Sequence, residues 1–329
     1  NLKLEANITK FLEVGLNANF TDRTSGNLET DWAYQIKYNT PFSLPYDDDG
    51  KLIAHPLGDS NIYKGYNQAY INQYQDVSSG NTSLNTTLSA KIKLPYRITY
   101  EVNFSPRYSW YYYRNWKSSE NIDDTNNGYV KRQSTKYFDW MLDNMLKWDY
   151  TINDVHRVGI TLLQNAEEHK TWSETMEASD FNPSDALGWH YVTSATNKVI
   201  SASDTHSTGD ALMARLFYSY DNRYLTTISL RRDGYSAFGN SNKRATFPSV
   251  ALGWVFTNEK FFKWSPMSNG KLRLSWGRNG NRNIGIYQAL SNLTTGSGKY
   301  TYIDKTGSIS EVSMLYINRM ANNDLKWET

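Results

Sequence analysis

The sequence lacks several features that would place it in a familiar class of protein. It has no cysteine in 329 residues, so neither a disulfide framework nor a thiolate metal site can form. No run approaches 18 apolar residues, which excludes a transmembrane helix. The formal net charge is only +2, so the chain has no basic footprint for a nucleic-acid partner. It also does not open with the basic and then apolar segment of a secretion signal.

The residues that are abundant favour strands and polar loops. Aromatic residues make up 15% of the chain, with 25 tyrosines, 12 phenylalanines and 11 tryptophans, yet the mean hydropathy is −0.67. Between Ile98 and Tyr112, apolar or aromatic residues such as Val102 alternate with polar ones such as Glu101. This period of two predicts a strand with one apolar and one wet face. A strand of that kind needs only about 9–11 residues to cross a membrane.

About ten segments share this period of two. They lie at Leu2–Ile8, Leu12–Phe20, Leu84–Leu94, Ile98–Tyr112, Phe138–Tyr150, Val158–Leu162, Leu212–Tyr220, Tyr224–Leu230, Val250–Phe256 and Leu272–Trp276. Short connections are expected after the first, third, fifth, seventh and ninth strands, and long polar loops on the other side, including 22–80, 115–135 and 168–207. Short helices are expected at Asp31–Tyr38 and Asn258–Phe262. We therefore predict an all-β fold, a transmembrane antiparallel β-barrel with long extracellular loops.

Two sets of residues are candidate site residues. The first consists of polar residues that alternate with the apolar face and are expected to point into the barrel lumen: Glu101, Asn103, Arg107, Asp139, Lys147, Arg215 and Arg273. The second consists of aromatic residues expected in loops, which could stack on a sugar or peptide: Tyr111, Tyr113, Trp116, Trp172 and Trp189. Aromatic residues of an interfacial girdle, or residues that pack within loops, would produce the same pattern.

The motifs of enzymes are incomplete in this sequence. The histidines show no paired metal spacing. Gly234–Gly239 is one residue too long for a nucleophile elbow, and Gly277–Gly280 lacks the Lys-Ser/Thr of a phosphate loop. Asp47–Gly50 resembles half of a calcium loop, but the other ligand positions are missing. We therefore predict no catalytic residue, no metal or cofactor site, and no enzyme activity.

Several stretches resemble the SusC-type (RagA/SusC-like) TonB-dependent outer-membrane transporters. They keep their order along nearly the whole chain and are Ile8–Gly15, Leu230–Gly239 (LRRDGYSAFG), Phe247–Trp254 (FPSVALGW), Asn258–Phe262, Lys271–Asn281 (KLRLSWGRNGN) with Ile284, Gly285 and Tyr287, and Asn323–Thr329. These motifs are landmarks of the barrel, so they assign no ligand-binding residue.

The resemblance implies a bacterial outer-membrane barrel of about 22 strands with a plugged lumen. Such a protein imports a glycan or peptide with energy from TonB, beneath a SusD-like surface lipoprotein that acts as a lid, and it contacts outer-membrane lipid. Residues 1–329 show no signal peptide, TonB-box region, plug domain or C-terminal strand set. We therefore expect the whole chain to be the middle portion of a longer barrel protein.

Two other interpretations stay open at this stage. The chain could belong to a non-transporting outer-membrane barrel, either an adhesin or an enzyme with catalysis in its loops. It could also be a soluble carbohydrate-binding β-protein rich in aromatic residues. Uptake that depends on the proton-motive force separates transport from the first alternative, and folding in buffer without detergent would identify the second.

Overall fold

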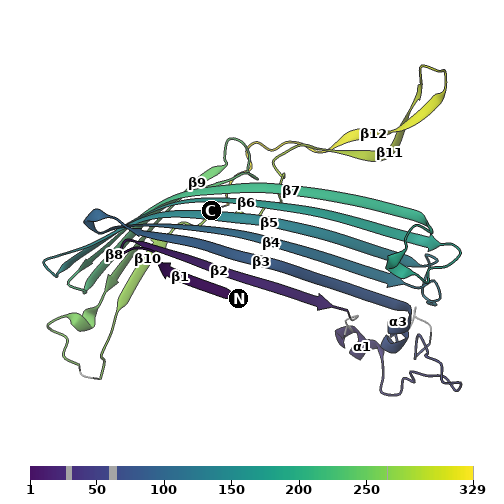
Figure 1. The fold of residues 1–329 in the computed structure, drawn as a ribbon, viewed down its shortest axis with the longest axis horizontal. Coiled ribbons are helices and arrows are strands. Elements are labelled where there is room, and N and C mark those ends of the chain that lie inside the picture. The colour runs from purple at the N-terminus through teal and green to yellow at the C-terminus, as the bar shows by residue number, and fades with distance from the viewer. Residues whose placement is uncertain (27–31, 59–64, 265, 329) are drawn as a thin grey trace.

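Ten strands form a single antiparallel sheet in the computed structural model, which describes residues 1–26, 32–58, 65–264 and 266–328. Each strand pairs with its neighbour in the sequence, so the sheet is a meander (Figure 1). The strands are β1 (Leu2–Asn7), β2 (Leu12–Ser25), β3 (Gln75–Lys93), β4 (Ile98–Lys117), β5 (Tyr129–Ile152), β6 (His156–Phe181), β7 (Ala195–Tyr220), β8 (Tyr224–Tyr235), β9 (Arg244–Trp254) and β10 (Leu272–Gly277). The predicted set of about ten antiparallel strands is confirmed.

The register keeps residues of one kind in the same row. Leu16 of β2 is paired with Leu88 of β3, Leu88 with Phe104 of β4, and Phe104 with Leu142 of β5. Successive side chains alternate between the two sides of a strand, so one side of the sheet collects the apolar residues. We call this side, which carries Val102, the apolar face, and the opposite side, which carries Glu101, the polar face. Leu88 is 47% exposed and Phe104 is 37% exposed, so the apolar face is uncovered.

The long strands extend much further than the sequence predicts. Most of the expected loop 168–207 lies in β6 and β7, which leaves 182–194 as their connection, and the expected loop 115–135 shrinks to 118–128. The physical reason is that the hydrogen bonds of a sheet join backbone groups and do not depend on the side chains. The alternation in the sequence, by contrast, is visible only where one face of the strand is apolar. Where both faces of a strand are polar the ladder continues, but the alternation that reveals it disappears.

The short connections contain the expected tight turns. Asp221 and Asn222 have φ values of +48° and +51°, and Asn153 and Asp154 have values of +50° and +57°. Asn and Asp tolerate this left-handed region, so they suit these three-residue turns. The expectation of a short ninth connection was wrong, because residues 255–271 form an extended loop with a 3₁₀ helix, η3 (Phe256–Asn258), at its start.

Helices occur mainly in the long segment between β2 and β3. The helix α1 (Trp32–Tyr38) agrees with the expected helix, whose first residue Asp31 lies outside the described residues. The helix α3 (Gln68–Tyr74) was not expected; the side chain of Asn67 caps it by accepting a hydrogen bond from the Ala69 backbone N at 3.0 Å. Two further 3₁₀ turns are η1 (Pro95–Arg97) and η2 (Gly188–His190). Among the described residues, no helix is long and apolar enough to cross a membrane.

A separate hairpin follows β10. Its strands β11 (Asn292–Ile303) and β12 (Ile309–Arg319) pair only with each other and project away from the sheet (Figure 1).

A hydrophobic cluster forms at the end of the sheet where β3 to β7 extend beyond β2 and β8. It is made of Val130, Ala178, Phe181, Trp189 and Ala195, with Trp116 and Val192 packed against it. The connection 182–194 is thereby fixed onto the strands that it joins.

Candidate functional site

The seven polar residues expected to face the lumen all lie on the polar face. Arg107 is paired with Asp139 across β4 and β5, and the row that contains Lys147 continues through Thr161 to Arg215. Arg273 of β10 is paired with Gly253, in the row that leads through Leu225 to Ser219. Glu101 and Asn103 occupy the same parity of β4 as Arg107. The two faces of the sheet are therefore chemically distinct.

A ladder of ionisable groups runs across β4, β5 and β6 on the polar face and then along β6. Arg107 Nε donates to Asp139 Oδ2 at 2.8 Å, and His169 Nδ1 lies 3.0 Å from Asp139 Oδ1. His169 Nε2 is 3.8 Å from Glu167 Oε1, and Glu167 accepts a hydrogen bond from Arg282 of the segment after β10. The side chains of Asp139 and Glu167 are only 14% and 11% exposed. Cationic partners therefore offset the cost of shielding these two carboxylates from water.

Other polar residues form isolated contacts outside this ladder. Lys147 Nζ donates to Glu101 Oε2 at 2.6 Å, between the same two strands. Arg215 and Arg273 make no ion pair within the described residues, so only some of the seven predicted residues contact one another. Sequence reasoning missed His169, Glu167 and Arg282, although the first two share the polar parity of β6.

A cavity of about 460 Å³ lies beside this ladder. Its charged lining includes Asp143, Glu167, Arg231, Asp233 and Arg282. Arg231 Nε donates to Asp233 Oδ1 at 2.8 Å. The described residues contain no group of three or more acidic or histidine side chains that could hold a metal ion. The cavity therefore offers fixed donors and acceptors for a polar solute.

The sequence motifs meet at one place in the structure. The Phe238 ring lies 4.9 Å from the Trp327 ring, and Phe247 packs edge-on against Trp327 at 5.5 Å. A Cβ on Gly239 would lie 2.0 Å from the backbone oxygen of Asn323. A Cβ on Gly280 would lie 2.2 Å from the Phe247 ring. These motifs, far apart in sequence, are therefore packing sites that hold the segments after β8 and β10 together.

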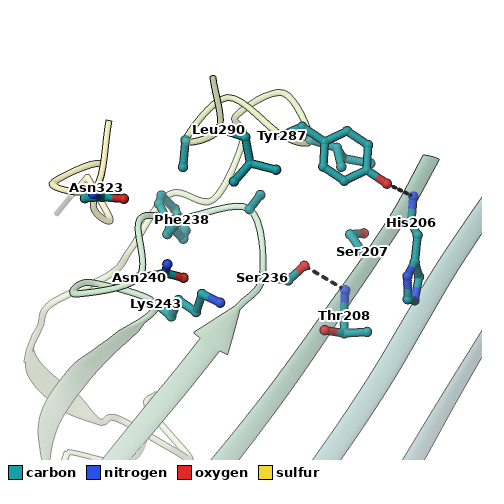
Figure 2. A pocket seen from close by; sticks show the side chains of 13 residues that line it. His206, Ser207, Thr208, Ser236, Phe238, Asn240, Lys243, Tyr287, Leu290 and Asn323 are labelled. Atoms are coloured by element: carbon teal, nitrogen blue, oxygen red, sulfur yellow. Dashed lines mark hydrogen bonds between the residues drawn. The ribbon is translucent and has the colours of Figure 1, made fainter. Parts of the chain in front are cut away.

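A second pocket, of about 230 Å³, separates the loop 236–243 from the segment that contains Tyr287 (Figure 2). The Tyr287 hydroxyl accepts a hydrogen bond from the His206 backbone N at 2.8 Å, and Ser236 Oγ accepts one from the Thr208 backbone N at 2.9 Å. Both segments are thus anchored on β7, and the pocket is a gap between anchored segments.

The five aromatic residues expected in loops are mostly in strands and do not converge. Tyr111 and Tyr113 lie on the polar face of β4, and Trp172 lies on the apolar parity of β6 with Lys136 Nζ 5.3 Å from its ring centroid. Trp116 and Trp189 belong to the hydrophobic cluster at the end of the sheet. The expectation of loop positions was wrong for all except Trp189, because β4 and β6 extend through polar sequence. A role in binding stays a prediction.

Comparisons with known proteins agree with the family that the sequence motifs indicate. No family model matches the chain. It is 25% identical, over 100% of its length and 30% of the relative's, to TonB-dependent receptor P39 of Formosa agariphila. Over 132 residues, 39% of this chain and 13% of the relative, it is 39% identical to TonB-dependent receptor SusC of Bacteroides thetaiotaomicron. The resemblance inferred from the motifs is confirmed.

Solved structures share the fold. The structure of the RagAB peptide transporter superposes with a TM-score of 0.79 and 19% sequence identity, covering 99% of this chain and 36% of that one. The 'open-open' state of the RagAB peptide importer gives a TM-score of 0.80 at 18% identity, with the same coverage. The chain thus spans at most about a third of the proteins that it matches, and its sheet is a portion of a β-barrel.

Proposed function

We propose that this chain, a portion of the barrel of a SusC-type TonB-dependent transporter, forms part of the wall through which a bacterial outer-membrane protein imports a nutrient. The apolar face would contact lipid and the polar face would line the import path. The side of the sheet with the turns 153–155 and 221–223 would face the periplasm, because outer-membrane barrels have short periplasmic turns.

One observation carries this proposal: an uncovered apolar face lies opposite a face of linked charges. Soluble monomers rarely expose a large continuous apolar surface, and here Leu88, Leu216 and Leu252 are all more than 40% exposed on three different strands. A barrel wall requires this alternation, with apolar residues outward and polar residues inward.

The solute is proposed to be an oligosaccharide or a peptide. The charged and amide groups around the 460 Å³ cavity, among them Asp143 and Arg231, can hydrogen-bond to either class. Tyr111 and Tyr113 on the same face offer rings for stacking. Energy from TonB and a SusD-like lipoprotein lid belong to the proposal, and the likeness to SusC-type proteins supports them.

Uptake in cells tests the proposal. The full-length protein would be expressed in a strain that lacks its own copy, and uptake of labelled oligosaccharide and peptide mixtures would be measured with and without a protonophore. We expect accumulation that requires both the protein and the proton-motive force. The same measurement in a strain that lacks TonB tests whether TonB supplies the energy for uptake.

The same preparation separates the alternatives. The protein purified from outer membranes in detergent should have an intact mass well above the 37.9 kDa of this chain and should retain a surface lipoprotein. A barrel located in the outer membrane that promotes no uptake would indicate an adhesin. A 37.9 kDa species that is folded without detergent would contradict the membrane assignment.

A further inference from the structure

The apolar face contains a depression of about 600 Å³. Its floor and walls are mainly aliphatic and come from four adjacent strands: Leu146, Leu162, Leu212, Ala214 and Leu230. Ala214 is exposed and stands between the larger Leu162 and Leu230, its register partners on β6 and β8. The small side chain therefore opens a hollow between neighbours that protrude further.

One rim of the depression is a polar ladder on a face that is mainly apolar. The Tyr100 hydroxyl donates to Asn144 Oδ1 at 2.7 Å, and Asn144 Nδ2 donates to Gln164 Oε1 at 2.7 Å. Gln164, at the end of this ladder, is exposed and lines the depression. Because its Oε1 accepts from Asn144, its Nε2 remains a donor for an acceptor from outside the sheet.

The opposite rim is Arg232 of β8. It is exposed, and its register partners are Leu212 on β7 and Thr246 on β9. Within the described residues it makes no ion pair. Arg244, in the next row of the same face, differs because its Nη2 donates to Asp210 Oδ1 at 2.9 Å. Arg232 therefore presents an uncompensated positive charge beside an apolar hollow.

The position of Arg232 along the strand places it near an edge of the apolar band. From Tyr224, at the short-turn end of β8, to Arg232 is eight residues, or about 27 Å at about 3.4 Å per residue. With a strand tilt of about 40°, this is about 20 Å along the membrane normal, within an apolar band about 25 Å tall. In the proposed orientation, with Tyr224 at the inner edge of this band, Arg232 thus lies near the outer interface, at the level where lipid phosphates are found.

We propose that this depression binds a phosphate-bearing lipid of the outer leaflet, lipid A. An acyl chain lies over Ala214 between Leu162 and Leu230, and a phosphate accepts hydrogen bonds from Arg232 and from the amide of Gln164. Guanidinium–phosphate pairs are among the strong charge-assisted hydrogen bonds, and the aliphatic floor suits the chain. This inference rests on the membrane orientation in the proposed function.

Native mass spectrometry of the full-length protein tests the site. Protein purified in detergent would be titrated with lipid A and with lipid A from which the phosphates have been removed. We expect Arg232→Gln to weaken lipid A binding about tenfold, which corresponds to about 1.4 kcal/mol. Ala214→Leu should weaken binding of both lipids because it fills the hollow without changing charge. Arg232→Lys should retain part of the affinity.

The control is the double variant Arg244→Gln with Asp210→Asn, which removes an arginine on the same face whose charge is already neutralised. It should bind lipid A like the unmodified protein. Equal binding of phosphorylated and dephosphorylated lipid A, or unchanged binding by Arg232→Gln, would overturn the proposal. These results would leave membrane insertion and uptake intact, whereas a protein that folds without detergent would overturn the proposed function as well.

Discussion

Two adjacent residues of β4 test the assignment of the faces most directly. Val102 lies on the apolar face between Ala90 of β3 and Asn144 of β5 in the register, whereas Asn103 lies on the polar face between Ser89 and Asp143. Substituting each by arginine introduces the same side chain one residue apart. The chemical change is nearly matched, so a difference in outcome reports which face meets lipid.

The expected loss of stability follows from the depth of the substituted residue in the membrane. Val102 is four residues from the start of β4 at Ile98, or about 10 Å along the membrane normal in a tilted strand, which is close to the middle of a band about 25 Å tall. Arginine at the midplane of a barrel costs about 2–4 kcal/mol, so we expect Val102→Arg to lower the free energy of unfolding by about 2–3 kcal/mol. Asn103→Arg should change it by less than about 0.5 kcal/mol, because the new cation faces Asp143 across the strand pair.

The assay is urea unfolding of the full-length protein in lipid vesicles, followed by tryptophan fluorescence and by the gel shift of folded barrels on heating. Both variants should first be compared for their amount in the outer membrane. Equal destabilisation by the two substitutions, or greater damage from Asn103→Arg, would refute the assignment of the apolar face to lipid and with it the proposed orientation of the barrel.

Three further predictions concern residues outside the lipid contact. Gly239→Ala should destabilise the protein by about 1–3 kcal/mol in urea unfolding, because its Cβ would lie 2.0 Å from the backbone oxygen of Asn323, and backbone yields less easily than the end of a flexible side chain. Hydrogen bonds from the Tyr224 hydroxyl and from its other donors lower the pKa of Glu259 from 4.5, so the ionised form stabilises the fold above that pH and the stabilisation fades as pH falls through the lowered value. Thermal melts of wild type should drop on acidification below about pH 4.5, and Glu259→Gln should flatten that dependence. Glu167→Gln should weaken the contact to Arg282 by about 1 kcal/mol, and limited proteolysis should then cut the segment 278–291 faster; an unchanged cleavage rate would show that this ion pair does not hold the segment.

The sequence alone was sufficient for the parts of the fold where the two faces differ. Ile98–Tyr112 and Leu212–Tyr220 alternate clearly because one side is apolar, and the Asp221–Asn222 turn follows from backbone angles that few other residues accept. Beyond the apolar band both faces are polar, so the outer halves of β6 and β7 carry no period and were predicted as loop.

Only part of the charged ladder could be predicted from the sequence. Arg107 and Asp139 could be assigned to one face from parity, but the contact from Arg282 to Glu167 joins residues 115 apart in sequence. Nothing local to either residue indicates that partner. Likewise, the glycines at 239 and 280 stood out in the motifs, but the reason for them is the approach of residues 323–328, which only the folded chain brings close.

The length of β6 and β7 has a mechanical consequence. Each has 26 residues, and about 11 are enough to cross a membrane, so about 15 residues of each strand, or about 40 Å along the normal, stand beyond the lipid in the proposed orientation. Because continuous backbone hydrogen bonds join the two strands, this extension forms a rigid wall. Any partner that binds at the rim of this wall would therefore act on the barrel from about 40 Å above the membrane surface.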